Sequence, residues 1–197
     1  MYQKTITNEE LALLPAATCK GEVIVVSDND NDAAADYLGS CAVIGFDTET
    51  RPSFKKGVTY PLALLQLSGG DRTFLFRVDR MKLSNKIVKI LRSKSIIKVG
   101  VDIRDDIKKL QKIVSFKPEN FMDLQIEIAK YDIEEKSLRK ISGIVLKQRV
   151  SKAQRLSNWS AQTLTAQQIE YAATDAYITR EIYMEFLKNP CIKATSI

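Results

Sequence analysis

Residues 42–49 read Ala-Val-Ile-Gly-Phe-Asp-Thr-Glu, an apolar run that ends in two acids. The first five residues favour a buried β-strand because they are apolar and prone to β-structure. Two similar runs follow at residues 62–67 and 73–76, and Gly-Gly-Asp at 69–71 is a turn signal between them. We therefore expect a central strand that is followed along the chain by a β-hairpin.

Strand and helix patterns continue on both sides of these runs. Upstream, the patterns predict a strand at 22–27, an acidic turn at 28–32 and a short helix at 33–38. Downstream, they predict strands at 96–101 and 121–122 and helices at 81–91, 103–114, 124–130, 138–145 and 166–187. This order indicates an α/β fold with a mixed β-sheet flanked by α-helices, its early strands antiparallel and its later ones joined by crossover helices.

The bulk properties indicate one cytoplasmic domain. At 197 residues and 45% hydrophobic content, the chain is long enough for one sizeable core. We expect an N-terminal arm at 1–21, the domain itself at 22–190 and a C-terminal tail at 191–197. The sparse cysteines (Cys19, Cys41 and Cys191) are typical of reduced thiols in the cytosol. The N-terminus has no apolar signal region, and no run approaches the ~18 apolar residues that would indicate a membrane span.

The chain contains no histidine. This excludes catalytic triads with an imidazole base, zinc sites with histidine ligands and histidine pH switches. Any chemistry must use carboxylates, tyrosine, lysine, cysteine, hydroxyls or a bound metal. The net charge is +6, and the stretch 136–169 has no acid. Its seven bases attract polyanions or form an ordinary solvated surface, and charge alone does not decide between the two.

Two pairs of residues are candidates for chemistry. Asp47 and Glu49 point to the same face of a strand, where they repel each other unless a divalent cation lies between them. The alternative is a strand end that turns into solvent. Tyr171 and Asp175 share a face of the last helix, whose start is marked by a capping box, although on this spacing alone an ordinary surface pair is the better explanation. The box consists of Thr165 and Gln168.

A third segment carries Asp102, Asp105 and Asp106 around the start of the helix after residue 101. Asp106 borders the apolar stripe of that helix, so we expect it to face inward. Asp105 falls on the face that carries lysines and is expected to form a solvated ion pair. Asp102 lies at the junction of strand and helix and is a candidate N-cap.

Taken together, the three segments resemble the 3′-to-5′ exonucleases of the DEDD superfamily, most of all the ribonuclease D and Werner-syndrome-type group. The matching motifs lie at residues 44–54, 99–110 and 156–176, with 63–67 resembling the second core strand of the family. The resemblance covers about residues 22–187. It implies a ribonuclease H-like fold and the branch of the superfamily that has tyrosine, at Tyr171, where the other branch has histidine.

The resemblance also implies two-metal hydrolysis of the terminal phosphodiester, with Mg²⁺ or Mn²⁺ as cofactor. Asp47, Glu49 and Asp175 would hold the first ion; Asp47 would bridge to the second, which Asp106 would support partly through water. Glu49 would also meet the terminal 3′-hydroxyl. Free tyrosine has a pKa of ~10, so Tyr171 is expected to orient a metal-activated water and not to act as the base.

The implied substrate is single-stranded or 3′-recessed DNA or RNA, with release of nucleoside monophosphates. We expect phosphate or terminal contacts from Thr48, Glu49, Lys55, Lys56 and Lys152. Trp159 either stacks on a base or, as we favour, anchors the core. The chain has no room for the helicase or helical modules of larger relatives, so we expect this domain or a partner protein to select substrates. The alternatives are an inactive nucleic-acid-binding or scaffold protein on the same fold and an enzyme for small oligonucleotides only.

Overall fold

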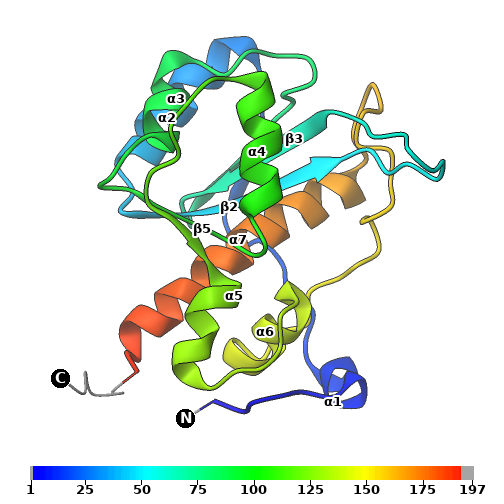
Figure 1. Cartoon of the computed structure of the whole chain (residues 1–197), viewed down its shortest axis with the longest axis vertical. Coiled ribbons are helices and arrows are strands. Elements are labelled where there is room, and N and C mark those ends of the chain that lie inside the picture. Colours follow the sequence, from blue (N-terminus) through cyan, green and yellow to red (C-terminus); the bar gives the residue numbers. More distant parts are fainter. Residues whose placement is uncertain (1, 192–197) are drawn as a thin grey trace.

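The computed structural model describes residues 2–191, within which six strands form one mixed sheet in the order β1-β4-β3-β2-β5-β6 (Figure 1). β2 lies between an antiparallel neighbour, β3, and a parallel one, β5. β4 is antiparallel to β3, and β6 is parallel to β5. The strands are β1 (Glu22–Val26), β2 (Val43–Thr50), β3 (Leu62–Ser68), β4 (Arg72–Phe76), β5 (Ile97–Gly100) and β6 (Phe121–Asp123).

The predicted hairpin is confirmed as β3 and β4, and β5 and β6 are parallel as expected. The expectation that all early strands are antiparallel is wrong for β1, which pairs in parallel with β4 at the edge of the sheet. A parallel pair requires a crossover connection, and the long segment between β1 and β4, which contains a helix and two strands, supplies one. β2 continues past its apolar run to Thr50 and thereby carries both acids within the strand.

Helices cover both faces of the sheet (Figure 1). α2 (Asn31–Gly39), α3 (Asn85–Leu91) and α4 (Arg104–Ile113) pack on one face, where their apolar residues form a core with Ile44 and Phe46 of β2. α7 (Ala166–Lys188) crosses the other face. The predicted capping box of Thr165 and Gln168 is present at its start. Among the helices of residues 2–191, none combines the length and apolar character needed to cross a membrane.

The far half of α7 packs with a smaller group of helices. These are α1 (Asn8–Leu13), α5 (Leu124–Glu127) with the 3-10 turn Ile128–Tyr131 that continues it, and α6 (Leu138–Val145). A second 3-10 turn, Asp28–Asp30, precedes α2. The predicted N-terminal arm contains α1, and its Ile6 and Leu11 are buried in the same core as Ile182 of α7. The arm is therefore a packed part of the body. The predicted tail lies outside the described residues except for Cys191.

One glycine determines how closely α7 approaches β2. A Cβ on Gly45 would lie 1.8 Å from the carbonyl oxygen of Ala176, so no other residue fits there without moving the helix. The facing residues of α7, Ala172, Ala173 and Ala176, are fully buried. Small residues on both elements bring the helix backbone against the strand, next to the acids of β2.

The start of α4 differs from the prediction. Asp102 is not the N-cap: it has a left-handed backbone conformation (φ 57°), and Ile103 stands at the cap position without a side-chain cap. The carboxylate of Asp123, at the end of β6, instead accepts hydrogen bonds from the backbone N–H groups of Asp102 and Ile103, at 3.0 and 3.2 Å. A residue that is distant in sequence therefore satisfies donors at this turn.

Candidate active site

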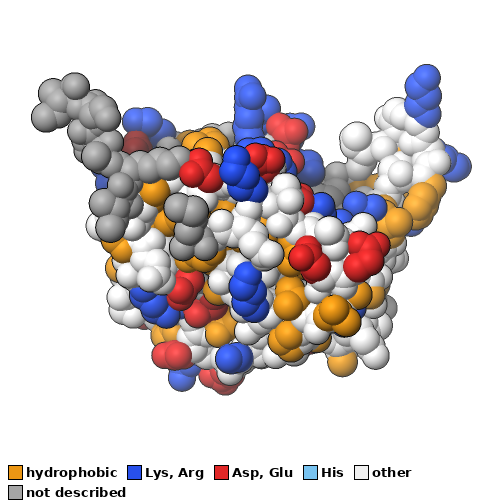
Figure 2. Space-filling model, turned by 90° about the horizontal axis from the view of Figure 1, so that it is seen from below, with side chains coloured by type: hydrophobic (Ala, Val, Ile, Leu, Met, Phe, Trp, Pro, Cys, Tyr) orange, Lys and Arg blue, Asp and Glu red, His pale blue; other side chains and the backbone are white. Residues whose placement is uncertain are grey.

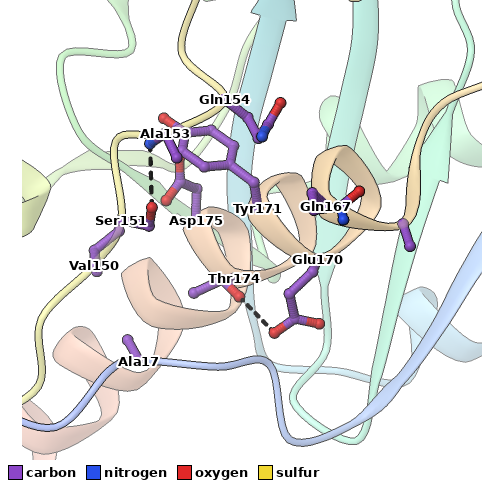
Figure 3. A pocket seen from close by; sticks show the side chains of 11 residues that line it. Ala17, Val150, Ser151, Ala153, Gln154, Gln167, Glu170, Tyr171, Thr174 and Asp175 are labelled. Atoms are coloured by element: carbon purple, nitrogen blue, oxygen red, sulfur yellow. Dashed lines mark hydrogen bonds between the residues drawn. The ribbon is translucent and has the colours of Figure 1, made fainter. Parts of the chain in front are cut away.

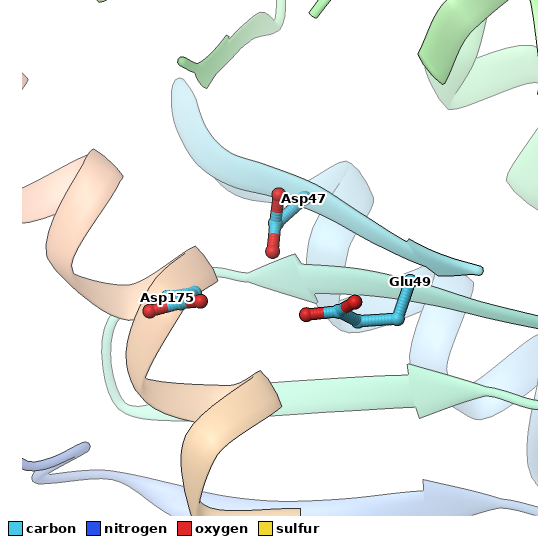
Figure 4. A group of neighbouring side chains, drawn as sticks. All are labelled: Asp47, Glu49 and Asp175. Atoms are coloured by element: carbon cyan, nitrogen blue, oxygen red, sulfur yellow. The ribbon is translucent and has the colours of Figure 1, made fainter. Parts of the chain in front are cut away.

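Three carboxylates meet where β2 passes under α7 (Figure 4). One oxygen each of Asp47, Glu49 and Asp175 lies within 4.8 Å of the other two. Asp47 and Glu49 share the face of β2 that also carries Gly45, because strand residues alternate in direction. The close approach at Gly45 places Asp175 opposite them.

These carboxylates are costly to ionise together. Burial raises the pKa of Asp47 well above its ordinary value, and the charges of Asp175 and Asp106 raise it further. Burial also raises the pKa of Glu49 to about 10 and that of Asp175 to about 7. Asp175 is buried, and its Oδ1 atom has no hydrogen-bond partner among the described residues. Such a group is stable as a set of anions only when a cation compensates it.

The donor set fits a hard divalent cation. Carboxylate oxygens are the ligands that Mg²⁺ and Mn²⁺ prefer, and the unpartnered oxygen of Asp175 is free to ligate. The described residues contain no second group of three such side chains in comparable proximity. The site is therefore a specific feature of this end of β2 and not one of several acidic clusters.

Asp106 approaches the same strand from the other side. Its Oδ1 accepts a hydrogen bond of 2.7 Å from the Thr48 hydroxyl, and the Lys109 ammonium lies 3.8 Å away. Burial raises the pKa of Asp106, and the bond from Thr48 opposes this effect. Asp106 lies outside the group of three, although its charge raises the pKa of both Asp47 and Glu49. The predicted ion pair of Asp105 is confirmed, with Lys108 at 2.8 Å.

Thr48 has a role that the sequence interpretation missed. We expected it to contact substrate, but its side chain is buried and its hydroxyl is bound to Asp106. Because residues alternate along a strand, Thr48 points away from the face shared by Asp47 and Glu49. The alternation of strand residues could have predicted from the sequence that Thr48 points to the opposite face of the sheet from the two acids.

Tyr171 lies one helical turn before Asp175, and the two side chains lie next to each other in Figure 3. Burial raises the pKa of Tyr171 well above its ordinary value, and the negative charges of Asp175, Glu49 and Asp47 raise it further. This shift favours the protonated phenol in the metal-free chain. A cavity of about 410 Å³ opens beside both residues, between α7 and the loop at residues 150–154.

The burial of Trp159 bears on the two roles considered for it. The ring is fully buried and packs with Leu64, Leu75 and Ala172. Its centroid lies 5.9 Å from that of Tyr171. Since the indole has no exposed surface, stacking on a base, the less favoured alternative, is not available in this conformation. The favoured alternative, a core anchor, agrees with this burial. The indole packs in the apolar cluster next to which the Tyr171 ring lies.

The three predicted lysine contacts are exposed. Lys55 and Lys56 lie in the turn between β2 and β3, and Lys152 lies in the loop beside the cavity. Within residues 2–191, none of the three forms an ion pair, so each ammonium is free to meet a phosphate.

The acid-free stretch does not form one uniform basic patch. Lys140 pairs with Glu135 at 2.7 Å, and Lys136 donates to the backbone carbonyl of Gln125 at 3.0 Å. Figure 2 shows basic side chains interspersed with acidic ones on the face it presents. Part of this positive charge therefore has local structural partners, and the bases near the cavity remain as candidates for nucleic-acid contact.

A family model described as 3′-5′ exonuclease matches residues 23–189. The mouse bifunctional 3′-5′ exonuclease/ATP-dependent helicase WRN is 35% identical over an alignment of 150 residues that covers 73% of this chain and 11% of that protein. This chain therefore spans only a small part of that relative.

Two solved structures show the same fold. The EXO domain of Aedes aegypti Nibbler matches with a TM-score of 0.77 and 23% identity, covering 88% of this chain and 92% of that one. Trypanosoma brucei RNase D in complex with RNA U12 matches with a TM-score of 0.74 and 20% identity, covering 91% and 65%. The predicted fold, a ribonuclease H-like mixed sheet with flanking helices, is confirmed.

Proposed function

The chain belongs to the 3′-5′ exonuclease family, and we propose that it is an active, metal-dependent member that releases nucleoside monophosphates from the 3′ end of DNA or RNA. The observation that carries the proposal is the convergence of Asp47, Glu49 and Asp175. An inactive descendant of the family has no reason to keep three mutually repelling carboxylates, one buried and two half-buried, because apolar residues of similar volume would be at least as stable.

The carboxylates have distinct roles in this proposal. Asp47, Glu49 and Asp175 would hold one Mg²⁺ or Mn²⁺, and Asp47 would bridge to a second that Asp106 supports partly through water. When bound, such a pair of ions stabilises the attacking and leaving oxygens and lowers the pKa of water. Glu49 would also accept a hydrogen bond from the terminal 3′-hydroxyl and so select a free 3′ end.

Tyr171 would orient the attacking water. Its raised pKa keeps the proton on the phenolic oxygen, so the hydroxyl acts as a hydrogen-bonding group beside Asp175 and not as a base. The buried indole of Trp159 limits the movement of the Tyr171 ring. In this proposal Tyr171 orients the water and the metal ions activate it, which agrees with a chain that has no histidine to remove a proton.

Lys55, Lys56 and Lys152 would bind the phosphates of the strand that enters the site. A backbone contact of this kind weakens with added salt. We expect Lys152→Ala to reduce the slope of log binding affinity against log salt concentration by about 1 and to leave the cleavage step itself unchanged. Filter binding of a 3′-labelled oligonucleotide at several salt concentrations measures this effect. An unchanged slope and unchanged affinity would remove Lys152 from the contact surface.

A digestion panel tests the proposed activity. The substrates are 3′-labelled single-stranded, duplex and recessed DNA and RNA, each with Mg²⁺, with Mn²⁺ and with EDTA. We expect loss of 3′ nucleotides that requires metal and that disappears in Asp47→Asn. Asp105→Asn is the matched control, because its carboxylate pairs with Lys108 on the surface. Metal-dependent loss from no substrate would overturn the proposal, and binding without digestion would favour the inactive nucleic-acid-binding alternative.

A further inference from the structure

Gln66 is a buried amide without partners. It lies in the middle of β3 with no exposed surface, and neither its Oε1 nor its Nε2 atom has a hydrogen-bond partner among the described residues. Buried polar side-chain atoms are nearly always paired, because an unpaired one costs about 1–3 kcal/mol. Both ends of one amide left unpaired therefore call for a functional explanation.

The register of the sheet shows what Gln66 faces. In the antiparallel pair of β2 and β3, Gln66 is directly opposite Asp47, and Gly45 is opposite Ser68. Directly opposed residues project to the same face, with Cβ atoms about 4.5–5.5 Å apart. This is the face covered by α7, since Gly45 meets Ala176 there. Gln66 is therefore the β3 residue opposite Asp47 on this face, although no hydrogen bond joins its amide to the carboxylate in this structure.

The other neighbours of Gln66 on this face offer no alternative acceptor. Leu64 precedes it along the strand, and Leu75 is opposite it on β4; both belong to an apolar cluster with Trp159. Ser68 follows along the strand, but its hydroxyl already accepts from Thr73 at 2.8 Å. The carboxylate of Asp47 is thus the polar group in register with the unpaired amide.

We propose that Gln66 is a positioning residue: its Nε2–H, unpaired in this structure, would donate to the Asp47 carboxylate once that carboxylate ligates a divalent cation, and would hold it in that orientation. The inference rests on the proposed function, since it concerns the same site. Carboxylate ligands of metals are generally held by hydrogen bonds from neighbouring groups. A neutral amide suits this place because it orients the carboxylate without bringing a positive charge that would compete with the metal.

Gln66→Met tests the proposal, with Gln66→Leu as a second variant should the first pack poorly. Both keep the approximate volume and remove the amide. Ser68→Ala is the matched control, since it changes a buried polar residue on the same strand and face whose hydroxyl has a partner. The measurements, on the full chain, are Mn²⁺ binding by titration calorimetry without substrate, the thermal midpoint in EDTA, and the rate of 3′ digestion against Mn²⁺ concentration.

We expect Gln66→Met to bind Mn²⁺ about 10–100-fold more weakly and to need correspondingly more Mn²⁺ for digestion. Its midpoint in EDTA should be unchanged or higher, because an apolar isostere removes an unpaired buried amide. Ser68→Ala should bind Mn²⁺ like the original chain.

Two results would overturn the inference alone. The first is an unchanged Mn²⁺ affinity in both Gln66 variants. The second is a weaker affinity accompanied by a lower thermal midpoint in EDTA, which would show a merely structural role. Failure of the unaltered chain to bind Mn²⁺ at all would overturn the proposed function and this inference with it. Because binding is measured without substrate, that failure is distinguishable from loss of the Gln66 effect.

Discussion

Helices α4 and α7 each bring one aspartate to the end of β2, but the two carboxylates have opposite surroundings. Asp106, on α4, accepts a hydrogen bond from Thr48 and has Lys109 nearby. Asp175, on α7, is buried beside two other acids and has an oxygen without a partner. The α4 carboxylate is compensated by groups of the protein itself, whereas the α7 carboxylate has no basic partner among the described ion pairs and would ionise together with its two acidic neighbours only beside a cation.

The difference follows from how the helices pack. α7 lies against the sheet through Gly45 and a row of alanines, so Asp175 is buried and its charge is weakly screened. α4 presents Asp106 in its first turn, at the edge of the site, where solvent and a lysine side chain reach it. The α7 side should therefore depend more strongly on metal, and four predictions test this contrast.

The largest effect is expected for Asp175→Asn. It removes a ligand charge worth several kcal/mol to the reaction, which corresponds to a loss of roughly three orders of magnitude in rate. The thermal midpoint in EDTA should rise at the same time, because repulsion with Asp47 and Glu49 is relieved. Initial rates of 3′ nucleotide release and thermal unfolding measure the two effects. A variant that keeps its rate would show that α7 does not carry the catalytic carboxylate.

Tyr171→Phe is expected to have the next largest effect. Loss of the hydroxyl that orients the attacking water should reduce the rate by about 10²-fold. Mn²⁺ affinity should stay within a factor of two, because the carboxylates are untouched and the ring is retained against Trp159. Calorimetry and initial rates on the same preparation separate binding from chemistry. Full activity in this variant would contradict the assigned role.

A smaller effect is expected on the α4 side, for Thr48→Val. The isosteric change removes the hydrogen bond to Asp106, whose net value is about 1 kcal/mol, so the rate or the metal requirement should shift by roughly fivefold. Thr50→Val, two residues further along β2, is the control. A loss of rate as large as that of Asp175→Asn would show that the reaction depends on the α4 side of the site as strongly as on the α7 side.

The smallest of the four effects is a pH dependence of the metal-free stability. The pKa values of Asp175 (about 7) and Glu49 (about 10) are raised in the folded chain. A raised acid pKa contributes stability that is complete below the unfolded value near ~4 and is lost as pH rises toward the folded value. The midpoint in EDTA should therefore fall between pH 5 and pH 7.5, and added Mg²⁺ should reverse the trend because it binds the deprotonated ligands.

Asp175→Asn provides the control for this experiment, since it should flatten the slope in EDTA. Lys98 acts in the opposite direction, because burial lowers its pKa to about 8, but its contribution changes only above the range compared. A midpoint that rises from pH 5 to pH 7.5 without metal would contradict the account of the carboxylate cluster.

Much of the fold was predictable because its signals are local. The apolar runs of β2, β3 and β4, the turn between the last two and the capping box of Thr165 and Gln168 depend on residues a few positions apart. The candidate carboxylates were also found in this way, as acids at the end of a buried strand and on one face of a helix. Local spacing determines which face a side chain takes, which made Asp47, Glu49 and Asp106 candidates, and the family resemblance then assigned them to a metal site.

Long-range packing determined the rest. The parallel edge pairing of β1, the cap that Asp123 provides for α4, the burial of Trp159 and the position of Gln66 opposite Asp47 each join residues distant in sequence. No periodicity records such pairings, because they arise from the way whole elements bury their apolar faces against each other. The sequence thus determined the acids and the elements that carry them. Tertiary packing decided that three of those acids bring their carboxylate oxygens close enough together to ligate one cation.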